Sequence, residues 1–257
     1  MKGILGKSAV VTGGARGIGK GISIRLADEG AKLIIVDIDE DAARCTAEEL
    51  CRRGVQAEAY KADLRNITEI DAMVDYVYNK YNSIDILINN AGIQIREWAT
   101  DFDEEKFDFL MDLNLKAYYF ASRAAAKYMK TQEHGGAIVC ISSANSKCYT
   151  SKRSPYNISK AAVNGLVGTL AVEWGRFNIR INAVAPGYVL TDMVQKGIND
   201  GIIDMQANFK VIPMKRLLRT DEIAGGVCFL ASDEASGITG QTLFIDGGWS
   251  NCGLPED

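Results

Sequence analysis

Hydrophobic and polar residues follow two different spacings along the chain. Short runs rich in valine, isoleucine and leucine are typical of buried strands, and longer segments repeat apolar residues every three or four positions, as amphipathic helices do. The short runs predict seven strands: Ser8–Thr12, Leu33–Asp37, Val55–Lys61, Ile84–Asn89, Ala137–Ser142, Ile179–Ala185 and Thr242–Asp246. The longer segments predict six helices: Gly17–Glu29, Glu40–Arg53, Ile67–Tyr81, Asp103–Lys130, Tyr156–Phe177 and Asp221–Ala231.

Strands and helices alternate along the sequence, which predicts an α/β fold with parallel strands, right-handed crossovers and helices on both faces of the sheet. No Pro- or Ser-rich linker and no repeat divides the chain, so we expect a single domain over residues 1–257. Residues 189–219 show no clear element and are rich in Gly, Asn and Asp. A loop of that length in a compact domain is usually functional, and we expect it to be a substrate lid.

The bulk composition disfavours several classes of function. Of the 257 residues, 47% are hydrophobic and 24% charged, as in ordinary globular proteins. The net charge of −4 and the isoelectric point near 5.3 argue against nucleic acid as a partner, which would require a basic face. No apolar run approaches the ~20 residues of a membrane helix, and the apolar part of the N-terminus is too short for a signal peptide.

Cysteine and histidine usage narrows the chemistry further. The six cysteines show neither paired nor C-x-x-C spacing, which is most simply read as a cytoplasmic chain with reduced thiols. His134 is the only histidine, and it lies in the polar segment QEHGG. We therefore expect no metal site, and a base other than histidine.

A glycine-rich turn follows the first predicted strand and opens the first predicted helix. The segment TGGARGIG contains Gly13, Arg16, Gly17, Ile18 and Gly19, with the spacing G-x-x-x-G-x-G. Glycines there permit a tight turn and let backbone N–H groups approach a pyrophosphate at the helix N-terminus. The placement between a strand and a helix predicts a dinucleotide site.

Asp37 closes the second predicted strand, 18 residues after Gly19, where a carboxylate can bind the ribose hydroxyls of adenosine. It would repel a 2′-phosphate, and the neighbouring Ile38 carries no charge to offset that repulsion. Arg16 favours NADP instead, because a basic residue in the turn could bind such a phosphate. We give Asp37 more weight, since it would contact the discriminating hydroxyl directly, and expect NAD rather than NADP.

Two further strand ends carry candidate cofactor contacts. Asp63 and Leu64 follow the third strand and could receive the adenine amino group, although Asp63 could equally cap a surface turn. Asn90, Ala91 and Gly92 follow the fourth strand. Their small size would leave room for a flat ring, and the alternative is a plain turn.

Tyr156 and Lys160 have the spacing of a proton-transfer pair. Four residues apart in a helix, they lie on one face, one turn apart. A cation ~4 Å from the phenol, at an effective dielectric of ~20, contributes roughly 4 kcal/mol, which would lower a tyrosine pKa of ~10 by about three units. Ser143 follows a short apolar run and could present its hydroxyl to the same point. The alternative is an ordinary buried tyrosine beside a solvated lysine.

These motifs together resemble the short-chain dehydrogenase/reductase family. TGGARGIG, NNAG, DLNLK, Ser143, YNISK and PGYVLT occur in that family's order and span nearly the whole chain. The resemblance implies a Rossmann-type, doubly wound sheet of seven strands that binds NAD(P) at the carboxyl ends of its strands. It also implies hydride transfer between the nicotinamide and a carbonyl/alcohol pair.

The resemblance implies roles for the catalytic residues. Tyr156 would be the acid/base, Ser143 would polarise the substrate oxygen, and Lys160 would lower the tyrosine pKa and bind the nicotinamide ribose. Asn114, in DLNLK, would help to hold a water that links Lys160 to solvent. Ser142 competes with Ser143, which we prefer because it stands 13 residues before Tyr156, the family's usual spacing.

The resemblance also extends the cofactor site to the segment PGYVLT. Pro186 and Gly187 would lead into it. Thr191, together with the backbone of Val189, would hold the nicotinamide carboxamide.

The substrate-facing segments are polar and basic on an acidic protein. Their candidate contacts are Gln94, Arg96, Asn145, Lys147, Arg153 and Tyr188. A steroid or fatty-acyl pocket should be mostly apolar, so this set favours a small hydroxylated compound such as a polyol, sugar or sugar acid. The basic side chains could instead be solvated loop charges. A 3-oxoacyl thioester reductase, a hydroxysteroid or diol dehydrogenase, and a non-catalytic cofactor-binding regulator stay open as alternatives.

Self-association is the last expectation. Two predicted helices carry more small and apolar residues than one buried face requires, among them Ala121, Ala124, Ala125, Ala161, Ala162, Gly165 and Gly168. The resemblance implies that these helices form a four-helix interface, repeated by two-fold symmetry into a homotetramer. Tight packing against the sheet is the alternative.

Overall fold

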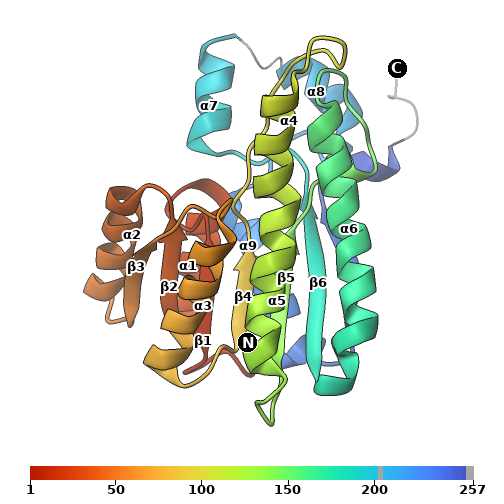
Figure 1. Ribbon diagram of the computed structural model, residues 1–257. Coiled ribbons are helices and arrows are strands. Elements are labelled where there is room, and N and C mark those ends of the chain that lie inside the picture. The colour runs from red at the N-terminus through yellow and green to blue at the C-terminus, as the bar shows by residue number, and fades with distance from the viewer. Residues whose placement is uncertain (202–204, 253–257) are drawn as a thin grey trace.

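The computed structural model describes residues 1–201 and 205–252, and these contain one seven-stranded parallel sheet (Figure 1). The strand order is β3-β2-β1-β4-β5-β6-β7. The strands are β1 (Ser8–Thr12), β2 (Lys32–Asp37), β3 (Ala57–Lys61), β4 (Ile86–Asn89), β5 (Gly136–Ile141), β6 (Ile179–Pro186) and β7 (Thr242–Ile245). All seven predicted strands are confirmed, with ends shifted by two residues at most.

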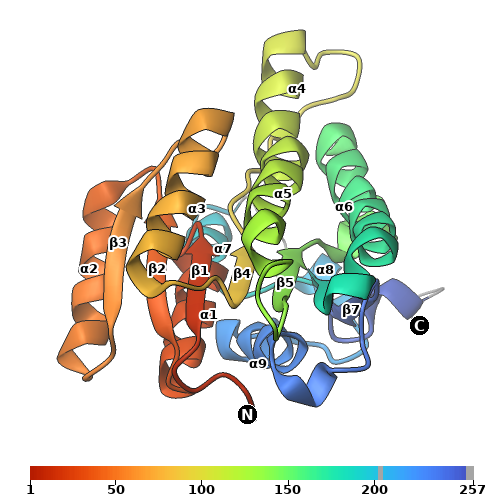
Figure 2. The ribbon, with the colours of Figure 1, turned by 60° about the horizontal axis from the view of Figure 1, so that its bottom comes forward.

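Helices cover both faces of this sheet, as Figure 2 shows from below. The helices are α1 (Gly17–Asp28), α2 (Glu40–Arg52), α3 (Ile67–Tyr81), α4 (Glu104–Met111), α5 (Ala117–Met129), α6 (Ser154–Trp174), α7 (Asp192–Asn199), α8 (Met205–Val211) and α9 (Thr220–Ala231). Helices α1, α2 and α9 pack on one face, and α3, α5 and α6 on the other. The predicted Rossmann-type α/β fold is thereby confirmed.

The central strands contribute to two hydrophobic cores because their side chains alternate between the two faces. In β1, Val11 packs in the core under α1, α2 and α9, whereas Val10 packs in the core under α3, α5 and α6. In β2, Ile35 and Ile34 divide in the same way. Burial on both faces explains why these strands read as continuous apolar runs in the sequence.

The strand order reverses between β1 and β4, where one half of the sheet leads outward through β2 and the other through β5. In open α/β sheets, ligands bind at such a switch point, beyond the carboxyl ends of the strands. Helices α7 and α8 lie over that end of the sheet (Figure 1). Over the described ranges 1–201 and 205–252, no helix is both long enough and apolar enough to cross a membrane.

Two predicted features differ in the structure. The helix predicted over Asp103–Lys130 is divided by a π-helical segment, Asp112–Lys116, between α4 and α5. Apolar periodicity cannot reveal this, because one extra residue in a turn shifts the pattern only slightly. The stretch 189–219, predicted to lack regular elements, contains α7 and α8. Both are too short, at eight and seven residues, for a clear amphipathic repeat.

Candidate active site

The glycine-rich turn between β1 and α1 is packed too tightly for side chains. Gly13 has a φ of +60°, and a Cβ on it would lie 2.9 Å from the Cα of Ala91. A Cβ on Gly19 would lie 2.0 Å from the carbonyl oxygen of Gly13. The first turn of α1 contains no acidic residue, and the side chain of the N-cap residue Arg16 makes no capping hydrogen bond. The positive helix end and its backbone N–H groups therefore fit the pyrophosphate of a dinucleotide.

Thr12 ties this turn to the end of β4. Its hydroxyl donates to the carbonyl of Ile88 (3.1 Å) and accepts from the N–H groups of Asn90 (2.9 Å) and Ala91 (3.2 Å). The Asn90 amide in turn donates to the carbonyls of Thr12 and Gly13. Nothing in the sequence singles out Thr12, since a threonine at the end of a strand is a common residue in a common place.

Asp37 lies half-buried at the end of β2, and its carboxylate accepts from the N–H of Asp39 at 3.1 Å. Asp39 caps α2 through the N–H of Ala42 (3.0 Å) and forms an ion pair with Arg16 at 2.6 Å. The amide of Ala42 and the charge of Arg16 both lower the pKa of Asp39. The positive charge of Arg16 is thus already matched by a carboxylate, while Ile38 is exposed.

Asp63 lies after β3, and its side chain is engaged locally. The carboxylate accepts from the backbone N–H of Arg65 (3.0 Å) and from the Arg65 guanidinium, which lowers the pKa of Asp63. This geometry matches the surface-turn alternative for Asp63. The adjacent Leu64 is buried.

Ser143 and Tyr156 meet at the carboxyl end of β5. Ser143 follows the strand, and its hydroxyl accepts from the N–H of Asn145 at 3.1 Å. Tyr156 lies in the first turn of α6, beside Pro155, which suits that position because it has no N–H to satisfy. Burial raises the pKa of Tyr156, and a hydrogen bond with Ser143 opposes the rise. Ser142 faces elsewhere, since its hydroxyl donates to the carbonyl of Lys160 at 3.0 Å.

Lys160 is buried beneath Tyr156, with its ammonium 5.9 Å from the centre of the phenol ring. The ammonium donates to the carbonyl of Ile141 at 2.8 Å and to the hydroxyl of Tyr118 at 3.4 Å. Burial lowers the pKa of Lys160 to about 8. Nothing in the sequence had identified Tyr118 as a neighbour of this lysine.

The structure departs from the expected coupling between Lys160 and Tyr156. The pKa of Tyr156 is raised rather than lowered, and the cation that opposes the rise is Arg153. The physical reason is that the Ile141 carbonyl holds the Lys160 ammonium, whereas Arg153 precedes Tyr156 by three residues at the start of the same helix.

Asn114 lies in the π-helical segment and is fully buried. Its amide exchanges two hydrogen bonds with the backbone of Ile93 (2.8 and 2.9 Å) and donates to the Ser159 hydroxyl at 3.2 Å. A Cβ on Gly92 would lie 3.0 Å from the Asn114 oxygen and 3.6 Å from the Lys160 ammonium. Gly92, Asn114 and Lys160 therefore lie close together. The π-helical segment that carries Asn114 agrees with this, because π-bulges are frequent at functional sites.

The segment after β6 extends over the start of α1. Pro186 ends β6, and a Cβ on the following Gly187 would lie 2.8 Å from the Cα of Asp246. Val189 is buried and pairs with Leu218. Thr191 caps α7 by accepting from the N–H of Val194 at 3.3 Å. Its methyl carbon would lie 3.5 Å from a Cβ on Gly17, so the start of the predicted lid adjoins the glycine-rich turn.

The predicted substrate residues divide into two groups. Asn145 donates to the Thr150 hydroxyl (2.8 Å), and Lys147 donates to Asn251 (3.1 Å), so both side chains hold local structure. Arg96, Arg153 and Tyr188 instead interact electrostatically with one another or with Tyr156. Gln94 is exposed on the same loop as Arg96.

Known proteins resemble this chain over nearly its whole length. The family model described as enoyl-(acyl carrier protein) reductase matches residues 13–250. The 2-dehydro-3-deoxy-D-gluconate 5-dehydrogenase of Escherichia coli K12 is 37% identical over 247 residues, 95% of each chain. The 3-oxoacyl-[acyl-carrier-protein] reductase FabG of Staphylococcus epidermidis is 35% identical over 245 residues, 95% of this chain and 99% of its own.

Solved structures agree. The structure of gox2181 has a TM-score of 0.93 at 34% identity and 96% coverage of both chains. A gluconate 5-dehydrogenase from Burkholderia cenocepacia, in complex with NADP and tartrate, has a TM-score of 0.91 at 32% identity, covering 98% of this chain and 96% of its own. The fold, the arrangement of the site and these matches together show that the chain belongs to the short-chain dehydrogenase/reductase family, whose members are oxidoreductases that bind a nicotinamide cofactor.

Proposed function

We propose that the protein interconverts a secondary alcohol and a ketone on a small polyol, sugar or sugar acid, with NAD as its cofactor. The observation that carries the proposal is the convergence of Ser143, Tyr156 and Lys160 at the carboxyl edge of the sheet, near the glycine-rich turn. When bound, the nicotinamide supplies the hydride chemistry. The residues of the chain orient the substrate and move the proton.

In alcohol oxidation, the Ser143 hydroxyl binds the substrate oxygen and the Tyr156 phenolate removes its proton. Burial alone would keep the phenol protonated, so the reaction depends on the groups that lower its pKa, which are Ser143 and Arg153. The Lys160 ammonium, buried with a pKa of about 8, is charged near neutral pH and would bind a ribose hydroxyl of the cofactor. Asn114 holds the loop after β4 against this lysine through Ile93.

Three features of the ribose end support NAD over NADP. Asp37 contributes a negative charge where a 2′-phosphate would lie, Ile38 adds no positive one, and Arg16 is paired with Asp39. The NADP in the Burkholderia gluconate 5-dehydrogenase argues in the other direction. Kinetic comparison of the two cofactors therefore decides this part of the proposal.

The relatives bear on the substrate. The E. coli 2-dehydro-3-deoxy-D-gluconate 5-dehydrogenase and the Burkholderia gluconate 5-dehydrogenase are named for sugar acids, which supports the same substrate class here. The match to the S. epidermidis 3-oxoacyl reductase supports the second candidate, reduction of an acyl thioester. The basic residues Arg153, whose charge acts on Tyr156, and Arg96, near Arg153, favour the first.

A screen of alditols, aldonates, sugars and simple secondary alcohols with NAD, followed by NADH absorbance, tests the proposal. We expect turnover with at least one polyol or sugar acid. Exclusive turnover of a 3-oxoacyl thioester with NADPH would replace it with the second candidate.

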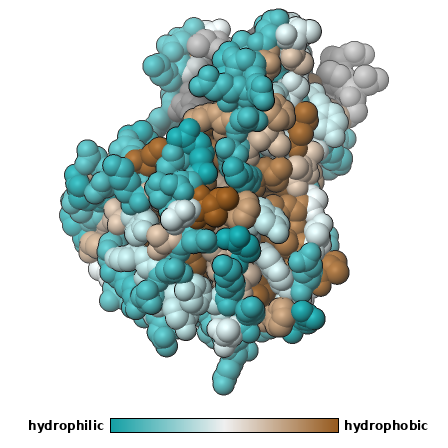
Figure 3. Space-filling model, viewed as in Figure 1, coloured by the Kyte–Doolittle hydropathy of each residue, from teal (hydrophilic) through white to brown (hydrophobic). Residues whose placement is uncertain are grey.

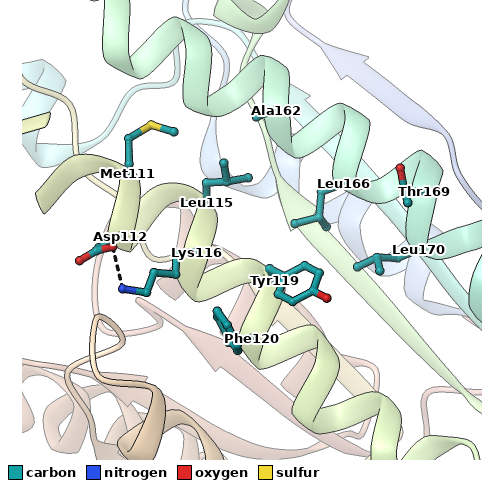
Figure 4. A pocket seen from close by; sticks show the side chains of 10 residues that line it. All are labelled: Met111, Asp112, Leu115, Lys116, Tyr119, Phe120, Ala162, Leu166, Thr169 and Leu170. Carbon is teal, nitrogen blue, oxygen red and sulfur yellow. Dashed lines mark hydrogen bonds and ion pairs between the residues drawn. The ribbon is translucent and has the colours of Figure 1, made fainter. Parts of the chain in front are cut away.

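A groove between α5 and α6 supports self-association. It has a volume of about 450 Å³ and extends along the π-helical segment to the end of α4, and apolar side chains of these elements face those of α6 across it (Figure 4). Brown hydrophobic residues gather over the same helices in Figure 3. The aliphatic side chain of Val172, further along α6, is 85% exposed, and a Cβ on Gly165 or Gly168 would meet open space. A second copy of this helix pair would cover the face, as a two-fold interface requires.

The alanines of α5 do not belong to this face. Ala121, Ala124 and Ala125 are buried within the chain, in the core formed with α3, so for them the alternative of packing against the sheet holds. We expect a homotetramer by light scattering at micromolar concentration. Val172→Asp should shift the mass towards smaller species, because it places a charge in the apolar contact, whereas Leu5→Asp, equally exposed elsewhere, should not. A monomeric wild-type protein would refute self-association.

A further inference from the structure

The arginines of this protein differ in how their charges are matched. Nine of them bind a carboxylate or backbone carbonyls through their guanidinium: Arg16, Arg25, Arg44, Arg53, Arg65, Arg123, Arg180, Arg216 and Arg219. Arg52 and Arg176 lack such a partner within the described residues but are exposed, where water compensates the charge. Arg96 and Arg153 also have none within that part of the chain, although Arg153 is only 9% exposed.

Arg153 occupies an electrostatically unfavourable position. Arg153 is the N-cap residue of α6, and its side chain makes no capping hydrogen bond. The first turn that follows contains no acidic residue. The N-terminus of a helix carries a partial positive charge, so the helix backbone repels a cation at this position. Other helices place Asp39, Asn66 or Asp103 at this position.

A second unmatched guanidinium lies beside it. The N–H of Glu97 donates to the carbonyl of Lys152 at 3.0 Å, which joins the loop that carries Arg96 to the residue before Arg153. Lys152 also lies over the ring of Trp98 at 4.8 Å. Partial burial and the charge of Arg153 both lower the pKa of Arg96, as expected when two cations lie near each other.

From this arrangement we propose that Arg96 and Arg153 together bind a carboxylate of the substrate, so that the enzyme acts on a hydroxy-acid anion such as an aldonate rather than on a neutral polyol. Two guanidinium groups can bind the two carboxylate oxygens through parallel N–H donors, and the anion compensates both cations and the helix end at once. The proposal rests on the proposed dehydrogenase function.

The position of Arg153 also explains how an anion would be oriented. Arg153 is the N-cap of α6, three residues before Tyr156, and its charge acts on the phenol. A carboxylate bound there leaves a hydroxyl further along a short carbon chain to reach Ser143 and Tyr156. Tyr188, whose hydroxyl contributes to the electrostatic environment of Arg96, stacks on Trp249 with the ring centres 4.9 Å apart. Arg96 is exposed, so an anion can reach it from solvent.

The test compares each aldonate of four to six carbons with the alditol of the same configuration, which differs only in the carboxylate. In Arg96→Gln, kcat/KM should fall at least about tenfold more for the aldonate than for the alditol, as expected for the loss of a charge-assisted contact. Arg153→Lys keeps the charge, loses the planar fork and should show an intermediate loss. Arg52→Gln, an exposed arginine on α2, should leave both substrates unchanged.

A binding measurement separates this proposal from the proposed function. In calorimetric titrations of Tyr156→Phe saturated with NADH, the dissociation constant of the aldonate should be at least about tenfold lower than that of the alditol. No turnover takes place in this measurement. Wild-type turnover of alditols with no preference for aldonates would leave the dehydrogenase function intact and overturn the carboxylate site. Equal losses for both substrates in Arg96→Gln, or a stronger preference for a phosphorylated polyol, would overturn it as well. Turnover of none of these compounds would refute the proposed function itself.

Discussion

Helices α1 and α6 both begin at the carboxyl edge of the sheet, and both begin without a capping side chain or an acidic residue in the first turn. Around α1 the neighbours are glycines, and the nearby charge of Arg16 is matched by Asp39. Around α6 the neighbours are functional side chains: Arg153, Tyr156 and Ser143. Backbone N–H groups are sufficient to bind a pyrophosphate, which is the same in every dinucleotide. Recognition of one particular substrate instead requires side chains, which can differ from one enzyme to another.

The α9 N-terminus shows what a purely structural helix start looks like in the same protein. Glu222 accepts from the backbone N–H of Arg219 at 2.8 Å and pairs with Arg216 at 2.7 Å. The positive helix end is thereby satisfied from within the chain. At the uncapped N-termini of α1 and α6, the backbone N–H groups of the first turn remain available to ligands.

If the α6 end performs the chemistry, Tyr156→Phe has the largest effect. We expect kcat to fall by ~10²-fold or more, the usual contribution of a general acid/base, while the dissociation constant of NAD changes little. Steady-state kinetics and fluorescence titration of NADH measure the two quantities. Tyr60→Phe, which keeps its aromatic contact with Tyr76, is the control. Full activity of Tyr156→Phe would end this mechanism.

The same tyrosine predicts the pH dependence of alcohol oxidation. Activity requires the phenolate, so kcat/KM should rise with pH through one ionisation. A cation lowers the pKa of a phenol, so Arg153→Gln should move this ionisation to higher pH. A profile that shifts only in Lys160→Ala would assign the tuning to that lysine instead.

If the α1 end binds the cofactor through its backbone, Gly19→Ala should weaken NAD binding at least about tenfold. The new methyl group would lie 2.0 Å from the Gly13 carbonyl and force the turn apart. Gly225→Ala is the matched control, because a Cβ there makes an ordinary 3.7 Å contact with Arg25. Equal NADH affinity in both variants would show that the turn does not contact the cofactor.

Cofactor choice should show a smaller, specific effect. We expect at least about a tenfold preference in kcat/KM for NAD over NADP, about 1.4 kcal/mol. Asp37→Ala should narrow it, because the carboxylate that repels a 2′-phosphate is removed. Ratios measured for wild type and variant under one salt concentration check this. Equal use of both cofactors by the wild type would point to Arg16 as a phosphate contact.

The smallest effect belongs to the structural helix end. Glu222→Gln should lower the free energy of unfolding at pH 7 by up to about 1 kcal/mol, because it removes the charge that pairs with Arg216 and with the helix end, and leave kcat/KM within about twofold. Arg216 and the Arg219 amide lower the pKa of Glu222 to about 2, below its unfolded value. This stabilisation is therefore present above about pH 4.5 and is lost as pH falls towards 2. Urea unfolding should show a difference between variant and wild type at pH 7 that disappears in acid.

The sequence alone determined the features that depend on near neighbours in the chain. The apolar runs of β1, β2, β4, β5 and β6 predicted these five central strands, since burial on both faces leaves few polar positions. Glycine spacing located the turn before α1, and the four-residue spacing of Tyr156 and Lys160 placed both on one face of α6. Helical periodicity and turn geometry are local, so they can be read from short segments.

Only the tertiary structure decided which distant residues meet. It brought Arg96 beside Arg153, across 57 positions of sequence, and directed the Lys160 ammonium to the Ile141 carbonyl rather than towards the phenol hydroxyl. The π-helical turn at Asn114 likewise depends on hydrogen bonds to the Ile93 backbone in another segment. Electrostatic energies vary with separation and burial, and neither quantity is set until the chain has packed.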